Sequence, residues 1–239
     1  MISVCIATYN GEKYIKEQLS SILSQLSDQD EIIISDDQSA DQTLQEIRSI
    51  NDPRIHIYTH KKDFKALFSI DNCIHNFVNA MKQAKGDIIF LSDQDDVWLP
   101  DKVKTMTLAL QHSDLVMSDC SITDEKLNIK TTSYTDCRPF KTSILSNFIK
   151  SSYLGSCMAF RRAVFERALP FPKHGVGHDL WLGMVARRWF NVSYVAKPLM
   201  LYRRHEETIT YCGMKNRTSL LFKIAYRLFI LKALFRLLI

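Results

Sequence analysis

The sequence of 239 residues lacks low-complexity tracts and has only seven glycines and six prolines, so disorder is expected at loop tips alone. Its formal net charge of +5 is too small to indicate nucleic-acid binding by itself. The N-terminus has neither a basic region nor a small-residue cleavage site, which argues against a signal peptide. What remains is a folded chain, long enough for one large domain or two small ones.

Paired cysteines are also missing. The chain contains no CxxC pair and no histidine at ligand spacing from a cysteine, which argues against a zinc site and a disulfide framework. Scattered thiols inside apolar runs are typical of a reducing cytoplasm. The cysteines are Cys5, Cys73, Cys120, Cys137, Cys157 and Cys212.

An apolar run long enough to span a bilayer is absent even from the C-terminus, "SLLFKIAYRLFILKALFRLLI", because four basic residues interrupt it. Lys223 and Arg227 fall on one face of a helix, and Lys232 and Arg236 on nearly the opposite face, so no clean amphipathic helix is predicted. Two interpretations stay open. The helix packs on the domain, or it lies on an anionic membrane surface; the second is favoured because such a helix is hard to bury on all sides.

Short apolar runs alternate with helical patterns in the first half of the chain. This order predicts an α/β fold, with a mostly parallel central sheet and helices on both faces. Strands are predicted at 2–8, 30–35, 54–58 and 87–91, and helices at 9–26, 39–50, 72–86 and 99–111. The second half predicts strands at 114–129, 192–196 and 199–205, a strand running into a helix at 155–169, and a helix at 178–190.

Polar segments follow three of these strands: "TYN" at 8–10, "SDDQSADQT" at 35–43 and "SDQDD" at 92–96. In parallel sheets ligands bind beyond the carboxyl ends of the strands, so we expect the three segments along one rim. The rim is acidic, and close carboxylates repel unless a cation or water intervenes. Asp93 and Asp95 stand two residues apart, a pattern that suits Mg²⁺ held together with a substrate diphosphate. The alternative is an acidic loop that caps the helix beginning near Pro100.

Three further segments carry a structural and a functional interpretation each. Asp36 and Asp37 lie at a strand tip, where they could face a base or ribose or simply precede a capped turn. Asp179 could cap a helix, or stand near Trp181 and accept a proton from a substrate hydroxyl. The basic segment 203–205 is either surface charge or a cationic site for a diphosphate.

In their order along the chain, these motifs resemble the family 2 glycosyltransferases, which have the GT-A (Rossmann-like) fold and use nucleotide-sugar donors. The resemblance rests on "SVCIATYNGEKYIKEQLSSILSQ", "DEIIISDDQSADQT", "KGDIIFLSDQDDVWLPDKV", "YLGSCMAFRRAVFERALPFP", "GHDLWL" and "LYRRH", and covers roughly residues 1–205. The variant with "SDQDDVW", "PFP" and "HDLWL" is similar to bacterial enzymes that assemble O-antigen, capsule or related polysaccharides.

The resemblance implies an inverting transfer that depends on Mg²⁺ or Mn²⁺. Asp179 would be the catalytic base, Asp93 and Asp95 would hold the metal, and His178 and Trp181 would line the acceptor side. His178 stands where the family often has glutamate. The residues implied to bind the nucleotide sugar are Thr8, Tyr9, Asp36, Asp37, Asp93, Asp96, Arg203, Arg204 and His205.

The expected architecture is a GT-A domain over 1–215, with a donor-binding half at 1–112, an acceptor half at 113–215, and an apolar, basic helix at 216–239. The expected partners are a nucleotide-diphosphate sugar and a lipid-linked saccharide, with no nucleic acid. The expected location is cytoplasmic, peripheral on the inner face of the membrane. Two alternatives are a sugar nucleotidyltransferase, for which "TYNGEKY" offers only one glycine, and a non-catalytic partner subunit.

Overall fold

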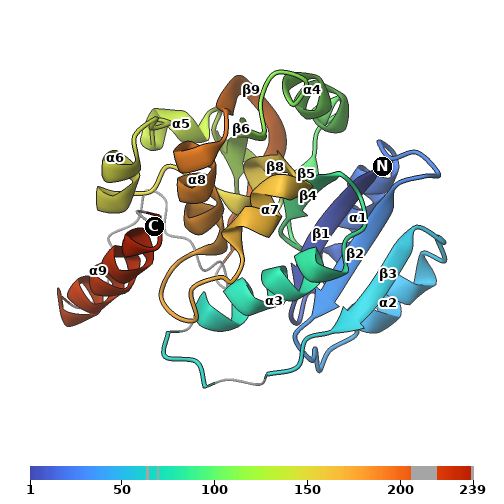
Figure 1. Ribbon diagram of the computed structural model, residues 1–239. Coiled ribbons are helices and arrows are strands. Elements are labelled where there is room, and N and C mark those ends of the chain that lie inside the picture. Colours follow the sequence, from blue (N-terminus) through green and yellow to red (C-terminus); the bar gives the residue numbers. More distant parts are fainter. Residues whose placement is uncertain (63–64, 69, 206–219, 238–239) are drawn as a thin grey trace.

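The computed structural model describes residues 1–62, 65–68, 70–205 and 220–237, and its centre is one mixed β-sheet (Figure 1). Within these residues the strands follow the order β3-β2-β1-β4-β8-β6-β9-β5, with β7 paired to β6. The strands are β1 (Ile2–Thr8), β2 (Glu31–Asp36), β3 (Ile55–Thr59), β4 (Ile88–Ser92), β5 (Val97–Trp98), β6 (Leu115–Thr123), β7 (Ile129–Thr131), β8 (Met158–Arg161) and β9 (Val192–Arg203).

Helices cover both faces of this sheet, as the sequence predicts. The long helices are α1 (Ile15–Leu23), α3 (Ile70–Gln83), α4 (Lys102–Ala109), α8 (His178–Trp189) and α9 (Leu220–Phe235). The shorter ones are α2 (Thr43–Ser49), α5 (Tyr134–Cys137), α6 (Ile144–Ile149) and α7 (Arg162–Ala168), together with the 3-10 turn η1 (Gly155–Cys157). Figure 1 shows α3 crossing the front of β1 and β2, against which it packs.

The first four strands are parallel, and β1 pairs with both β2 and β4. Their continuous apolar runs follow from burial on both faces: Val4, Cys5 and Ile6 of β1 have no exposed surface, and neither have Ile32, Ile33 and Ile34 of β2. This half of the fold confirms the expected α/β class.

The second half departs from a purely parallel sheet. Strand β8 runs antiparallel to both β4 and β6, whereas β6 and β9 are parallel to each other. Strand β9 is one strand of twelve residues where the sequence predicts two short ones, because the break at Lys197-Pro198 is absorbed by register shifts against Ser118 and Asp119. The two expected halves therefore share one sheet, since β4 of the first pairs with β8 of the second.

Helix α9 lies beside α6 at one side of the molecule (Figure 1). Ile230, Ala233 and Leu237 on this C-terminal segment are buried against the body of the protein. Among the described residues no helix combines the length and the apolarity that crossing a bilayer requires.

Candidate active site at the carboxyl edge of the sheet

Among the described residues, six strands end at the same edge of the sheet: β1, β2, β3, β4, β6 and β9. Strands β1, β2 and β4 are parallel, and β8 reverses direction between β4 and β6, so β6 and β9 again point the same way. This geometry brings the segments after Thr8, Asp36, Ser92, Thr123 and Arg203 to one rim, as the carboxyl-end rule predicts.

Several acids of this rim influence the pKa of one thiol, that of Cys73 on the first turn of α3. Burial raises its pKa most, and the charges of Asp93, Asp179, Asp37 and Asp95 raise it further. Carboxylates from the segment after β2, from the loop after β4 and from the start of α8 therefore lie close enough for their charges to act on the same group.

The loop after β4 holds the most perturbed acids. The pKa of Asp93 is raised to about 7, first by burial and then by the charge of Asp95. The pKa of Asp96, which is fully buried, is raised well above its usual range by burial and then by Asp95 and Asp93. One oxygen of Asp96 accepts from the backbone N–H of Arg203 at 3.0 Å, and the other, Oδ2, has no hydrogen-bond partner. A buried carboxylate oxygen without a partner is costly, so this loop favours an added cation.

Lys102 is a buried cation beneath this loop that the sequence pattern did not single out. Its Nζ donates to the carbonyl of Ser156 at 2.7 Å and lies 4.5 Å from the ring centroid of Trp98. Burial lowers the pKa of Lys102, and the charge of Lys102 in turn lowers that of Asp93. Burial of Lys102 could have been predicted from its spacing, because Lys102 shares a helix face with the buried Met106 and Leu110.

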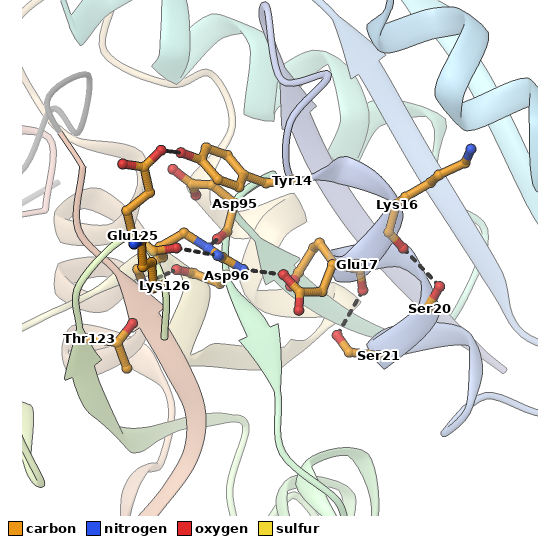
Figure 2. A network of polar contacts seen from close by, with 12 residues as sticks. Tyr14, Lys16, Glu17, Ser20, Ser21, Asp95, Asp96, Thr123, Glu125 and Lys126 are labelled. Carbon is orange, nitrogen blue, oxygen red and sulfur yellow. Dashed lines mark hydrogen bonds and ion pairs between the residues drawn. The ribbon is translucent and has the colours of Figure 1, made fainter. Parts of the chain in front are cut away.

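Arg203 fastens the acidic loop to the rest of the rim. Its Nε donates to the carbonyl of Asp95 and its Nη1 to the carbonyl of Glu125, each at 2.7 Å, and its Nη2 bonds the carboxylate of Glu17. The guanidinium also lies 4.7 Å from the ring centroid of Tyr14. Figure 2 shows Asp95 and Asp96 inside this network, with Glu17 on one side and Glu125, bonded to Tyr14, on the other. The structure thus gives Arg203 a positioning role, and none of its three guanidinium nitrogens is left without a protein partner.

The two neighbours of Arg203 are placed differently. Nη1 of Arg204 has no hydrogen-bond partner, while its backbone N–H donates to Thr123 of β6 at 3.0 Å. His205 contacts Oδ2 of Asp95 at 2.7 Å through Nε2, and its ring packs against Tyr14 with 5.1 Å between centroids. Of the two arginines 203 and 204, Arg204 is therefore the one with a guanidinium nitrogen that has no hydrogen-bond partner.

The end of β1 is held by a side chain of the acidic loop. Gln94 accepts from the backbone N–H of Tyr9 at 2.9 Å and donates to its carbonyl at 3.0 Å. Tyr9 is 54% exposed, with Nζ of Lys62 5.7 Å from its ring centroid, whereas Thr8 is buried and donates to Asp36 at 3.0 Å. A Cβ on Gly11 would lie 2.5 Å from Oε1 of Gln94, so a larger residue there would displace this side chain from Tyr9.

Asp36 and Asp37 have separate tasks although they are adjacent. Both oxygens of Asp36 accept from Ser39, and one also accepts from Thr8, which closes the turn after β2. Asp37 contacts Nδ1 of His60 at 2.8 Å and Nζ of Lys62 at 3.1 Å. The carboxylate of Asp36 is thus engaged in the turn after β2, whereas that of Asp37 contacts the cation of Lys62 and the ring of His60.

Asp179 lies in the first turn of α8, partly exposed, and its Oδ1 accepts from the N–H of Leu180 at 2.7 Å. Its charge contributes to the raised pKa of Asp93, so the two acids share one neighbourhood. A Cβ on Gly177 would lie 2.5 Å from Oδ1 of Asp179, which explains one glycine before the pair. Asp179 is thus an acid at the start of α8 whose charge acts on the loop after β4, and its role as the base stays a prediction.

His178 and Trp181 lie inside the protein. The ring of His178 stacks on Phe77 at 4.1 Å between centroids; burial lowers its pKa, and neither ring nitrogen has a hydrogen-bond partner. Trp181 is 2% exposed and donates to the carbonyl of Ala168 at 2.7 Å. The structure does not bring these two rings to an open acceptor surface, because α8 is buried on nearly every side.

The acidic loop suits a hard divalent cation by its donor set. Asp93 and Asp95 present carboxylate oxygens, which Mg²⁺ and Mn²⁺ accept, and the unpartnered oxygen of Asp96 marks an excess of negative charge. In the described ranges no group of three or more His, Cys, Asp or Glu side chains forms a metal cluster. One or two protein carboxylates suffice where substrate phosphates complete the coordination.

Comparison with known proteins identifies the family to which the chain belongs. The model of "Glycosyl transferase family 2" matches residues 3–169. An uncharacterized glycosyltransferase of Nostoc is 28% identical over 71% of this chain and 53% of that protein. The dTDP-rhamnosyl transferase RfbG of Shigella flexneri is 28% identical over 84% of this chain and 72% of its own length.

A shorter match is more similar. WfaP of Escherichia coli, a UDP-Glc:alpha-D-GlcNAc-diphosphoundecaprenol beta-1,3-glucosyltransferase, is 38% identical over 43% of this chain and 38% of that protein. The chain thus spans about half the length of the Nostoc relative and less of the E. coli one.

Solved structures share the fold. TarS 1-349 of S. aureus, in complex with UDP-GlcNAc, superposes with a TM-score of 0.66 at 21% identity, over 88% of this chain and 61% of that one. The mannosyltransferase PcManGT of Pyrobaculum calidifontis, in complex with GDP-Man and Mn2+, gives 0.58 at 19% identity over 88% and 58%. The expected GT-A fold class is confirmed.

Proposed function

The chain belongs to glycosyl transferase family 2, and from that premise we propose that it moves a sugar from a nucleoside-diphosphate donor to a hydroxyl of a lipid-linked saccharide, with inversion at the anomeric carbon. The observation that carries the proposal is the position of Asp37, Asp93, Asp95 and Asp179 at one edge of the sheet, where their charges act together in raising the pKa of Cys73. A site with this much negative charge suits a cation-bound diphosphate and a carboxylate base.

Each part of the rim takes a role in the reaction. Tyr9 and Asp37 border the nucleotide, Thr8 and Asp36 hold the strand ends beneath it, and Arg204, whose Nη1 is buried without a hydrogen-bond partner, would turn toward the diphosphate. Thr8 and Asp36 support the site without binding the ligand, because the hydroxyl of Thr8 already donates to Oδ1 of Asp36.

Asp93 and Asp95 would hold Mg²⁺ or Mn²⁺, which supplies charge neutralisation for the departing diphosphate. PcManGT, solved with GDP-Man and Mn2+, supports this assignment by analogy of fold. Asp96 and His205 fix the loop, through the backbone N–H of Arg203 and through Oδ2 of Asp95 respectively.

Asp179 takes the proton of the acceptor hydroxyl as its oxygen forms a bond to the anomeric carbon. The bond from that carbon to the diphosphate breaks, and the diphosphate leaves with the electron pair. Attack opposite to the leaving group inverts the carbon. Gly177 and the N–H of Leu180 keep the carboxylate in place at the start of α8.

The relatives suggest the acceptor class. The E. coli protein WfaP is named for an acceptor linked to diphosphoundecaprenol, so we assign this chain to bacterial envelope polysaccharide synthesis, peripheral on the inner face of the cytoplasmic membrane. In this proposal, residues 1–112 bind the donor and residues 113–215 bind the acceptor.

The test combines purified protein, Mn²⁺ or Mg²⁺, a panel of nucleotide sugars and a short lipid-diphosphate saccharide, with products identified by mass spectrometry. Release of nucleoside diphosphate with a mass gain of one sugar on the acceptor supports the proposal. Release of pyrophosphate would indicate a sugar nucleotidyltransferase instead, and no turnover with any donor would favour a non-catalytic partner subunit.

The base is tested in the same assay. Asp179→Asn is expected to keep donor binding and lose at least about a hundredfold in turnover, as loss of a general base does. Asp136→Asn, an exposed acid on α5, is the matched control and should keep full activity. Unchanged turnover of the Asp179 variant would assign the base to another residue.

A further inference from the structure

Over residues 225–237, whose burial the structure describes, the C-terminal segment is apolar on two opposite faces, one of them covered and the other exposed. Ile230, Ala233 and Leu237 are buried, each 3% exposed or less. Leu228, Leu231 and Phe235 are 59%, 42% and 60% exposed. At about 100° per residue the three exposed side chains fall within an arc of about 60°, opposite the buried set.

Basic residues border this exposed stripe on both sides. On the helical projection Arg227 lies beyond Leu231, while Lys232 and Arg236 lie beyond Leu228 on the other side, and all three are exposed. Residues 220–237 contain no Asp or Glu. The sequence pattern alone did not reveal this order, because it does not say which apolar residues the body covers.

The neighbouring helix α6 also exposes apolar side chains. Leu145 and Ile149 of α6, one helical turn apart, are 68% and 59% exposed. Nη2 of Arg227 donates to the carbonyl of Ile149 at 3.3 Å. Figure 1 shows α6 and α9 as neighbours on one side of the molecule. Helix α6 also contains no acid, and the exposed Lys150 follows it.

We propose that this surface, formed by Leu145, Ile149, Leu228, Leu231 and Phe235 with a border of Arg227, Lys232 and Arg236, docks on an anionic lipid bilayer. Apolar side chains enter the interface, and the basic border meets lipid phosphates. A contiguous apolar patch bordered by charge marks a binding surface in general. A second copy of the chain fits poorly, because a symmetric pair would bring the two basic borders together.

The other side of α9 connects the docking surface to the active site. Phe229 packs edge-on against Phe68 at 5.5 Å between centroids and lies 3.4 Å from the Cβ position of Gly175, whose φ is +66°. Gly175 belongs to the loop that leads into α8 and Asp179. Burial, together with the charge of Asp179, raises the pKa of Tyr226 to about 12. The docked helix would thus hold the base beside the membrane that carries the acceptor, an inference that rests on the proposed function.

The experiment is co-flotation of the full chain with vesicles of phosphatidylcholine mixed with phosphatidylglycerol, against phosphatidylcholine alone. Binding is expected to the first, and to weaken with added salt. Leu228→Gln with Leu231→Gln and Phe235→Gln should lower the partition coefficient at least roughly tenfold. Arg227→Gln with Lys232→Gln should lower it roughly fivefold for each charge, on anionic vesicles only.

The control is Leu108→Gln with Ile129→Gln, residues that are 60% and 55% exposed on α4 and β7, away from α9. It should bind vesicles like the unaltered protein, and all variants should keep their thermal unfolding midpoint. Equal vesicle binding by the triple variant would overturn the proposal, and so would a concentration-dependent dimer that only this variant abolishes. Vesicle binding without sugar transfer would refute the proposed function and leave the docking surface standing.

Discussion

Replacement of Arg203 tests whether this side chain stabilises the loop of Asp95 and Asp96 or binds a ligand. Arg204 beside it offers a matched control. Arg203 is 4% exposed, and its side chain contacts the carbonyls of Asp95 and Glu125, the carboxylate of Glu17 and the ring of Tyr14. Nη1 of Arg204 serves no acceptor.

The expected loss for Arg203→Ala follows from these contacts. Two partly buried carbonyls that lose their donor cost about 1 kcal/mol each. The cation–π contact contributes about 0.5–1 kcal/mol. The ion pair to Glu17, whose side chain is 51% exposed, adds about 0–1 kcal/mol. Together the variant is expected to lose about 3 kcal/mol, whereas Arg204→Ala should lose less than about 1 kcal/mol.

Urea unfolding followed by circular dichroism measures both variants. With an m-value of about 2.5 kcal/mol/M, the midpoint of Arg203→Ala should fall by about 1.2 M. Donor binding by isothermal titration should weaken more for Arg204→Ala than its small stability loss explains. If Arg203→Ala unfolds at the same urea concentration as Arg204→Ala while losing donor binding, the fastening role is refuted.

Three more predictions concern the acidic loop and the strand ends around it. In metal-free protein the folded pKa of Asp93, about 7, exceeds the unfolded value, so stability should fall as pH rises from about 4 to about 7, and Asp93→Asn should flatten that fall in urea titrations across pH. Lys102→Met removes a charge that lowers the pKa of Asp93, so Mn²⁺ binding by calorimetry should shift to higher pH; an unshifted profile would disconnect Lys102 from the loop. Gly11→Ala would push a Cβ against Gln94 and free Tyr9, so donor affinity should drop severalfold in titrations while the unfolding midpoint changes little; equal affinity would show that the clamp is dispensable.

The first half of the fold was predictable because its signals are local. Continuous apolar runs in β1 and β2 and helical spacing in α1 and α3 each reflect burial of one short segment. The second half was harder. Strand β5 has two residues, α5 and α6 are shorter than two turns, and the orientation of β8 depends on its neighbours β4 and β6.

The acidic rim was predictable for the same reason, since the carboxyl-end rule needs only the order of strands. The partners of Arg203 were not, because Glu17 lies 186 positions away in the chain and only the closed sheet brings them together. Trp181 and His178 show the opposite limit. Their residue types suit a binding site, yet α8 is buried nearly all round, and periodicity alone could not show it.

The position of β8 between β4 and β6 has a consequence for how the chain matures. On the ribosome, the strands up to β4 emerge first and form a parallel layer whose border at β4 has no neighbour yet. An unpaired edge at β4 can form hydrogen bonds with other nascent chains until β8 is synthesised and pairs with it. A gene fragment ending before β8 should therefore yield inclusion bodies, and supplying the missing portion as a separate polypeptide should recover soluble material.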